Sequence, residues 1–344
     1  MLSFGNRTTR ASIAALVASV TLGAAVAPSM AADPREINRG RIGLLTGSAS
    51  GTGLSIAADL ARVLDGKSNL RIVPYLSSGS VANIEDLTSF RFADMALINS
   101  DALLSQRLRN PDDERLNNIN YVARLFTNEV HVITRADSGI DSLSDLVGRR
   151  FAAGEARSGT FLTASLLLRA TGVRATAIAM PTDAGFDALA DGTVDAVFML
   201  AAKPSAFLRK ITSEENLALV QVPITENIRS VYKPGEFTSV DYPGLVRDKF
   251  VETVSVDVIL AAYGNAPEGS DKYRRIHAFV SELERNGAQF LRPPSHPKWQ
   301  QFSFDEEVGD LPRNAAAVAA LSGEEAVKTD RPSILDLMRQ GVDQ

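Results

Sequence analysis

Short apolar runs alternate along most of the chain with segments in which apolar residues recur every three or four positions. The runs predict strands and the recurring segments predict helices packed through one face. Strands that alternate with helices in this way favour parallel sheets covered on both faces. The predicted strands are 42–45, 71–76, 95–98, 121–125, 130–134, 150–153, 175–180, 196–200, 217–222 and 254–262, and the predicted helices are 52–64, 81–89, 160–170, 183–189, 204–211 and 271–291.

This order of elements predicts an α/β protein with two lobes, because 344 residues exceed the usual size of a single core. We expect strands 130–134 and 254–262 to cross between the lobes. The first lobe then comprises residues 33–129 plus 255–344, and the second comprises residues 130–254. The segment 223–244, which is rich in Pro, Gly and Tyr, is predicted to be an irregular connection.

The first 31 residues have the pattern of an export signal. Arg7 and Arg10 precede an apolar stretch from residue 13 to residue 27, and Ser29 and Ala31 supply small residues before a cleavage site. The stretch is too short for a membrane span. We therefore expect residues 1–31 to be a signal peptide and the remaining chain to be a soluble protein that acts outside the cytoplasm.

The composition of the chain excludes several kinds of site. The chain has no cysteine, which excludes disulfides, thiolate metal sites, cysteine nucleophiles and a lipidated cysteine. Its formal net charge is −5, so it lacks the basic character of a nucleic-acid-binding protein. Three histidines lie far apart, and no nucleophile has a recognisable setting. We expect a protein that is not an enzyme and that has neither a cofactor nor a metal.

Four turns rich in Gly, Ser and Thr each follow a predicted strand and lead into a helix. Such turns place backbone N–H groups at a helix N-terminus, where they attract anions. In parallel sheets the carboxyl ends of the strands share one edge, so the turns are expected to meet at a ligand cleft. The residues predicted to bind the ligand are Thr46, Gly47, Ser48, Gly51, Thr52, Ser78, Gly79, Ser80, Asn83, Asn99, Ser100, Asp101, Ser158, Gly159 and Thr160.

The first turn matches no nucleotide or hydrolase motif. It lacks the Gly-Lys-Ser/Thr ending of a phosphate-binding P-loop, and only Gly51 and Gly53 fit G-x-G-x-x-G. The central residue of Gly47–Gly51 is Ala49, so the G-x-S-x-G elbow is also absent. The alternative to ligand contact is an ordinary N-cap, and the sequence leaves both open.

Four charged or titratable residues extend the candidate site. Arg157 is the natural partner of a ligand carboxylate, with a surface arginine as the alternative. Lys203 follows the strand 196–200 and could place an ammonium group at the cleft, or be solvated. Glu129 and His131 lie at the predicted crossing, where a structural histidine is the alternative to a ligand contact.

A series of motifs, taken in order, resembles the TAXI family of solute-binding proteins, which is associated with TRAP-type transporters. The resemblance covers about residues 40–265. It lies in the turn Thr46–Gly51, the Gly-Ser-x-x-Asn turn Gly79–Asn83, the Ser100-Asp101 pair after Asn99, the stretch His131–Gly148, the Ser-Gly-Thr turn Ser158–Thr160 and the stretch Asp191–Phe198.

The resemblance implies a two-lobed periplasmic binding protein of type II. Such a protein captures a small solute, often an organic acid or acidic amino acid, and delivers it to a TRAP-type permease as a monomer. Where the family has Tyr-Tyr-Pro, this chain has Gly53-Leu54-Ser55, and it carries Arg157 and Lys203 where the family has other residues. These differences favour a more anionic ligand if both cations face the cleft.

Two other functions remain open from the sequence. The protein could be a ligand-dependent partner of a membrane sensor kinase, with no role in transport. It could also be a periplasmic enzyme, which the absence of a nucleophile setting and of a metal motif disfavours.

Overall fold

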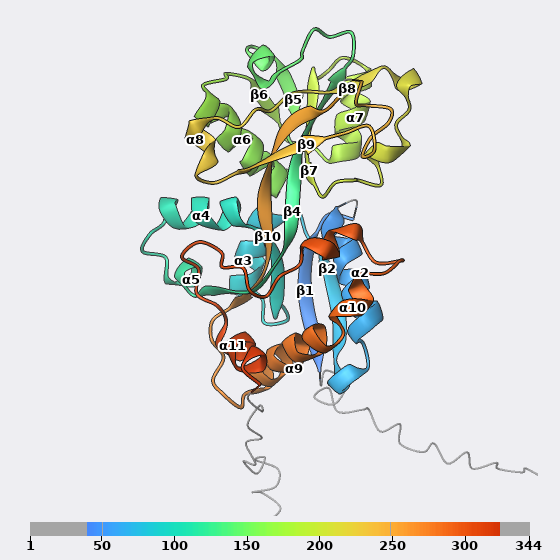
Figure 1. Cartoon of the computed structure of the whole chain (residues 1–344). Coiled ribbons are helices and arrows are strands. Elements are labelled where there is room, and N and C mark those ends of the chain that lie inside the picture. Colours follow the sequence, from blue (N-terminus) through green and yellow to red (C-terminus); the bar gives the residue numbers. More distant parts are fainter. Residues whose placement is uncertain (1–39, 50, 248, 324–344) are drawn as a thin grey trace, which may run out of the picture. The chain divides into compact units, whose positions relative to one another are not determined.

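The computed structural model describes residues 40–49, 51–247 and 249–323, which belong to one compact unit. The predicted signal peptide lies outside the described residues. Figure 1 shows two groups of elements joined by two long strands, and we call them the lower half and the upper half after their places in this view.

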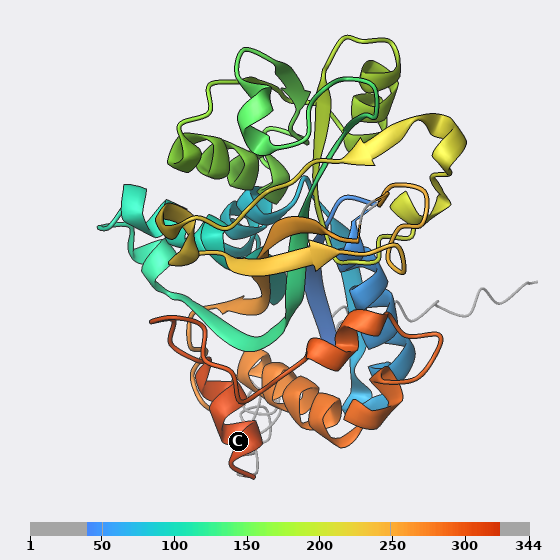
Figure 2. The ribbon, with the colours of Figure 1, turned by 45° about the horizontal axis from the view of Figure 1, so that its top comes forward.

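The lower half contains the beginning and the end of the described chain. Figure 2 shows the C-terminal elements, in orange and red, gathered on this half beside the blue N-terminal ones. Its elements are β1 (Arg41–Gly47), α2 (Thr52–Leu64), β2 (Arg71–Leu76), α3 (Ser80–Ser89), β3 (Met95–Asn99), α4 (Ser100–Arg109), α5 (Glu114–Asn117), α9 (Asp271–Arg285), α10 (Gly287–Phe290) and α11 (Ala315–Leu321).

The upper half is built from the middle of the chain. Its elements are β5 (Arg150–Ala152), α6 (Gly159–Thr171), β6 (Thr176–Ile178), α7 (Thr182–Ala190), β7 (Ala196–Ala201), β8 (Leu217–Leu219), α8 (Glu226–Arg229) and β9 (Lys233–Phe237). The two strands that join the halves are β4 (Ile119–Arg135) and β10 (Val251–Tyr263).

All described strands belong to one mixed sheet in the order β2-β1-β3-β10-β4-β7-β5-β6, with β8 paired to β4 and β9 paired to β10. β1 pairs in parallel with β2 and β3, and β5 pairs in parallel with β6 and β7. β4 and β10 are antiparallel to each other and to their outer neighbours. The expected α/β class is therefore confirmed, with helices flanking a sheet that is mixed.

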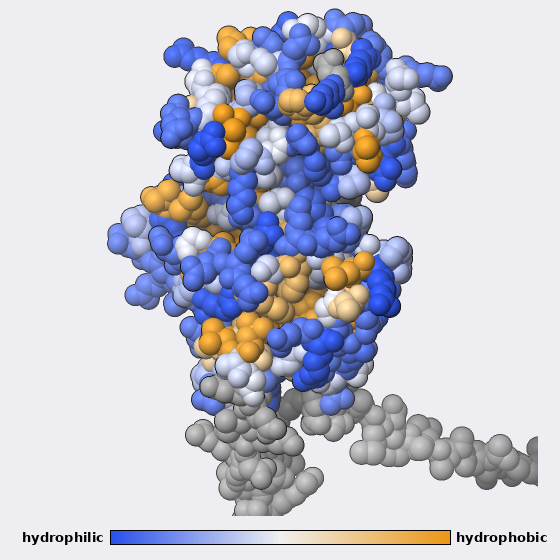
Figure 3. All heavy atoms as spheres, viewed as in Figure 1, coloured by the Kyte–Doolittle hydropathy of each residue, from blue (hydrophilic) through white to orange (hydrophobic). Residues whose placement is uncertain are grey.

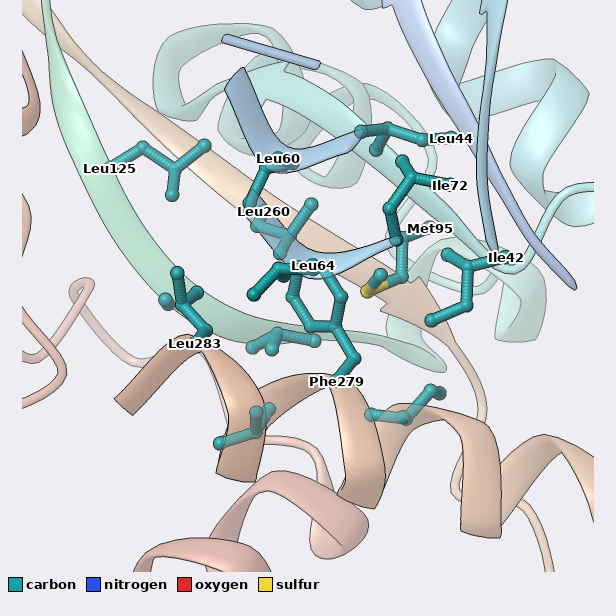
Figure 4. Close-up of a cluster of buried hydrophobic side chains, with 14 of the residues drawn as sticks. Ile42, Leu44, Leu60, Leu64, Ile72, Met95, Leu125, Leu260, Phe279 and Leu283 are labelled. Atoms are coloured by element: carbon teal, nitrogen blue, oxygen red, sulfur yellow. The ribbon is translucent and has the colours of Figure 1, made fainter. Parts of the chain in front are cut away.

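The core of the lower half packs helices against the apolar faces of β1, β2 and β3. Helix α9 buries Ile276, Phe279, Val280 and Leu283, whose spacing places them on one side of the helix. Figure 4 shows Phe279 and Leu283 pointing from α9 into the buried cluster that also contains Leu60 and Leu64 of α2. A second set of buried clusters lies in the upper half, around Phe151 and Phe198 and around Tyr242. The exact lobe boundaries stay a prediction.

Several predicted elements differ from those in the structure. The predicted strands 121–125 and 130–134 are one strand, β4, and the predicted helix 204–211 contains only the short 3₁₀ turn Leu208–Lys210. The connection 223–244 contains α8 and β9. None of the helices that the structure describes has the length and apolarity that a membrane crossing requires.

Candidate functional site

A cavity of about 140 Å³ lies where the two halves meet, and both halves line it. Its apolar floor comes from the central strands of the sheet: Leu97 of β3, Phe126 of β4, Leu200 of β7 and Val258 of β10. A cavity of about this size holds a molecule such as benzene, so a ligand of roughly six to ten non-hydrogen atoms fits it.

Five helix N-termini surround this floor. The lining includes the starts of α2 and α3 and the N-cap of α4 from the lower half, and the starts of α6 and α7 from the upper half. The N-cap residues of α2, α3, α4 and α7 are Gly51, Gly79, Asn99 and Pro181, and none of their side chains makes a capping hydrogen bond. Only Ser158 of α6 does so, as its Oγ accepts from Phe161 N at 3.0 Å. The first turns of these helices therefore face a common space.

The halves approach closely beside the cavity. A Cβ on Gly159 would lie 2.3 Å from Asn99 Nδ2, and one on Gly79, whose φ is +122°, would lie 3.2 Å from Ser158 Cα. Two hydrogen bonds also cross here: Ala82 N donates to Arg157 O at 3.1 Å, and Ala202 N donates to Thr52 Oγ1 at 3.2 Å. The structure is thus a closed arrangement, which requires glycine at the narrowest points.

The structure brings together twelve of the predicted residues in the cavity lining: Thr46, Gly47, Ser48, Gly51, Thr52, Ser78, Gly79, Ser80, Asn99, Ser158, Gly159 and Thr160. They come from all four predicted turns. The expectation that these turns share one edge therefore holds for their positions, whereas ligand contact stays a prediction.

Seven predicted residues lie outside the lining. Arg157 points to the carboxylates of Glu85 and Asp86 on α3. Lys203 Nζ donates to Glu236 O and lies 3.5 Å from Asp241 Oδ2. Both cations are held by the protein's own acceptors, because α3, β9 and the chain just after β9 present oxygens beside them. Asn83, Ser100, Asp101, Glu129 and His131 are also outside.

The structure gives several of these residues structural partners. Asn83 Nδ2 donates to Leu97 O at 2.7 Å and so ties α3 to β3. Ser100 begins α4 at the edge of another groove. His131 is fully buried, stacks on Phe237, and has Nε2 2.7 Å from Tyr242 Oη. Burial lowers the pKa of His131 to about 3, so the ring is neutral at physiological pH.

Glu129 forms a buried ion pair behind the cavity. Its Oε1 lies 2.5 Å from Lys298 Nζ, and its Oε2 accepts from Lys203 N at 2.7 Å. Both side chains of the pair are nearly inaccessible. Thr127 Oγ1 contacts the same two groups. This cluster connects the crossing strand β4, the chain after β7 and the C-terminal segment.

The cavity contains residues that the sequence analysis missed. They include the polar Asn128, Glu155, Thr182 and Asp183, beside Gly53, Gly154, Pro181 and the four apolar floor residues. Residues Pro181–Asp183 follow the predicted strand 175–180 and lead into a helix. The same order of strand, turn and helix identified the other four turns. The floor residues carried no such signal, since apolar strand residues occur throughout the core.

Electrostatically the cavity combines helix N-termini with carboxylates. Within the described residues its lining includes Glu155 and Asp183 but no Lys, Arg or His. Each helix N-terminus carries about half a positive charge. No group of three or more His, Cys, Asp or Glu side chains that could hold a metal ion occurs within the described ranges.

Fold and cavity together define an α/β protein that can enclose a small solute between two groups of elements. The chain belongs to the NMT1-like family, whose sequence profile matches residues 44–285.

Solved structures with a similar fold include two named binding proteins and one protein with a bound small molecule. The periplasmic binding protein BugD is 14% identical, with 76% of this chain and 85% of that chain covered and a TM-score of 0.48. MatC from Rhodopseudomonas palustris with bound malate is 15% identical, with 88% and 96% covered and a TM-score of 0.47. The alkanesulfonate-binding protein SsuA from Xanthomonas axonopodis pv. citri is 13% identical, with 88% and 91% covered and a TM-score of 0.42.

Proposed function

We propose that the protein is a periplasmic solute-binding protein that encloses a small anionic or zwitterionic solute, such as an organic acid or an acidic amino acid. The observation that carries this proposal is the convergence of five helix N-termini, four of them without a side-chain cap, on one cavity of solute size. First-turn N–H groups that have no side-chain acceptor favour an anionic ligand group, and the glycine N-caps of α2 and α3 offer no such acceptor.

The twelve lining residues from the predicted turns are the proposed ligand contacts. The N-termini of α2 and α3 contribute from one half and those of α6 and α7 from the other. A solute that contacts both sets stabilises the closed arrangement over an open one by the free energy of the contacts made only on closure. Capture and release by movement of the halves is therefore part of the proposal.

The carboxylates of Glu155 and Asp183 favour a zwitterion within this class. A dianion would be repelled by two carboxylates in a lining that has no cationic side chain among its described residues. An ammonium group on the solute would be attracted to the same carboxylates, while a solute carboxylate is held by the helix N-termini.

The TAXI motifs support a finer proposal, that the partner is a TRAP-type permease. This rests on the resemblance of Thr46–Gly51, Gly79–Asn83 and His131–Gly148 to that family. A permease encoded beside the gene and solute uptake that depends on both proteins would support it. A neighbouring sensor kinase whose activity depends on this protein would favour the sensor-partner alternative.

The first test is native mass spectrometry of protein purified from periplasm, followed by denaturation to identify a released solute. A stoichiometric organic acid or amino acid is the expected result. Protein that arrives empty, and then shows no thermal shift with a panel of carboxylates and amino acids, would overturn the proposal. Turnover of the bound molecule would point to an enzyme instead.

The charge preference has its own test. L-glutamate and glutarate differ only in the ammonium group, and titration calorimetry should show tighter binding of the amino acid if the cavity accepts solutes of this length. Glu155→Gln should reduce the difference between the affinities for L-glutamate and glutarate. Glu226→Gln removes a highly exposed carboxylate far from the lining and should leave the difference unchanged.

A further inference from the structure

Asp101 is a buried carboxylate at the junction of the two halves, outside the cavity lining. It is the second residue of α4 and is 1% exposed. Both of its side-chain hydrogen bonds cross the junction: Thr163 Oγ1 of α6 donates to Oδ2 at 2.6 Å, and the Tyr232 hydroxyl donates to the same oxygen at 3.0 Å. Figures 1 and 2 show α4 beneath α6 on one side of the molecule.

The second carboxylate oxygen has no such partner. Asp101 Oδ1 is buried and accepts no hydrogen bond from any described residue. A desolvated carboxylate oxygen without a donor disfavours the charged form, and this outweighs the donors on Oδ2 and the backbone N–H groups at the start of α4. Burial therefore raises the pKa of Asp101 above its ordinary value of 3.8.

No cation compensates this charge within the described chain. The elements packed on α4 are α3, α5, α6, β3 and β10. The titratable group that reaches Asp101 is the Tyr232 phenol, whose own pKa burial raises, so it stays a neutral donor. The other charged groups on or beside these elements are engaged elsewhere or exposed. Glu85 and Asp86 pair with Arg157, Arg115 with Asp113, Asp257 with Arg124 and Lys233, and Arg107 donates to the carbonyls of Leu116 and Ile119, while Arg109, Glu114, Arg169 and Glu252 are exposed.

We propose that Asp101, Thr163 and Tyr232 form a proton-dependent latch, which holds the two halves in the closed arrangement when the Asp101 carboxyl group is protonated. Closure removes this carboxyl from water, and opening returns it to water. The closed form binds a proton from solvent that the open form releases, so lowering the pH favours closure.

The latch rests on the proposed function in one respect only, because both require that the two halves move relative to each other. It adds that solute affinity depends on pH through a residue that does not line the cavity. Its test needs no solute, so its failure is distinguishable from a failure to bind one.

The test is a distance measurement between spin labels on the two sides of the latch. The chain has no cysteine, so Leu108→Cys on α4 and Arg169→Cys on α6 introduce the two labelling sites and no native cysteine has to be replaced. Both positions are exposed. In the solute-free full chain, the closed fraction should be larger at pH 5 than at pH 8, because the closed form binds the proton more tightly than the open form.

The matched variants separate the latch from other causes. Asp101→Asn is neutral at both pH values and of the same shape, so its closed fraction should be equal at pH 5 and pH 8. Glu85→Gln removes a half-exposed carboxylate that also bridges the junction, and it should respond to pH as the parent does. Thr163→Val removes a latch donor and should lower the closed fraction at pH 5.

Two results would overturn the latch. One is an equal closed fraction at both pH values in the parent chain. The other is the same pH response in Asp101→Asn as in the parent, with circular dichroism showing both to be folded.

Discussion

Lys298 is a lysine in a place where lysines are rarely found. Its side chain is 3% exposed, and its ammonium group is paired with the equally buried Glu129. Burial lowers the pKa of Lys298, and the Glu129 carboxylate opposes this by favouring the charged form. The pair is one contact among three that Glu129 makes, with Thr127 and Lys203 N providing the others.

Lys298→Met should lower the free energy of unfolding by about 3–5 kcal/mol, because it leaves the Glu129 carboxylate buried without its partner. Urea denaturation measures this. Arg135→Met breaks an exposed pair with Asp137 and should change the free energy by less than about 1 kcal/mol. Equal effects of the two substitutions would contradict the assignment of the Glu129 cluster as a structural element.

His131 predicts a pH dependence of stability. Its pKa in the folded chain is about 3 against 6.5 for the ordinary group, so the unfolded chain binds the proton first as the pH falls. The stability that this histidine contributes is complete above pH 6.5 and is lost as the pH falls toward 3. Between pH 8 and pH 5 the loss should be about 2 kcal/mol.

His131→Gln cannot take up this proton. Chemical denaturation at the two pH values should therefore show a smaller decrease for the variant than for the parent, whatever the stability of the variant at pH 8. Parallel pH profiles would show that His131 is not neutral and buried in the folded chain.

At the scale of single residues, the sequence predicts part of the cavity lining but not the contacts of every candidate residue. The glycines and hydroxyl residues of the turns were predictable, because a turn between a strand and a helix has a recognisable composition. The surroundings of Arg157 were not, since its partners Glu85 and Asp86 are about seventy residues earlier and meet it only in the folded chain. Phe126 lies in the apolar run of a strand, where nothing local distinguishes the cavity from the core.

Among the elements, the N-terminus of α6 lies against the N-termini of α3 and α4 from the other half. Gly159→Ala places a methyl group against Asn99 and Ser80, so the halves should close less fully and solute affinity should fall by about tenfold or more. Gly287→Ala is the matched control, because its added methyl group meets no atom within 4 Å. Titration calorimetry with the solute identified from the purified protein compares the two. Equal solute affinities of Gly159→Ala and Gly287→Ala would contradict the proposal that binding depends on closure of the halves.

The elements themselves were largely predictable, with instructive exceptions. Helices α2, α3, α6 and α7 begin within one residue of the predicted positions, since each follows a Gly-, Ser- or Pro-containing turn. Strand β4 was predicted as two strands because Thr127, Asn128 and Glu129 interrupt its apolar run. Those three polar residues line the cavity or bind Lys298, so the interruption marks a site rather than a chain break.

At the scale of the whole molecule, solute binding should protect both halves together. Hydrogen exchange with saturating solute should slow in the first turns of α2, α3, α6 and α7, because these turns line the cavity from opposite sides. The amides of α9, which packs beneath the lower half of the sheet, should exchange as before. Protection confined to one half would contradict closure around the solute.

The surface offers few further clues. The face shown in Figure 3 is mostly hydrophilic, and its apolar residues gather in separate small groups.

Composition and periodicity predicted the α/β class and the turns. They could not predict that the two sets of elements share one sheet, because the pairing of β4 with β10 joins residues more than a hundred positions apart.

That pairing has a mechanical consequence. β4 and β10 are hydrogen-bonded to each other from Ile119 to Glu129, so the halves are connected by a stiff ribbon rather than by two loose tethers. The register shifts at Val258–Ile259 and Leu260–Ala261, and such bulges are where a paired ribbon bends most easily. The proposed opening of the halves therefore has to bend this paired ribbon, and the hydrogen bonds between β4 and β10 restrict the directions in which it bends.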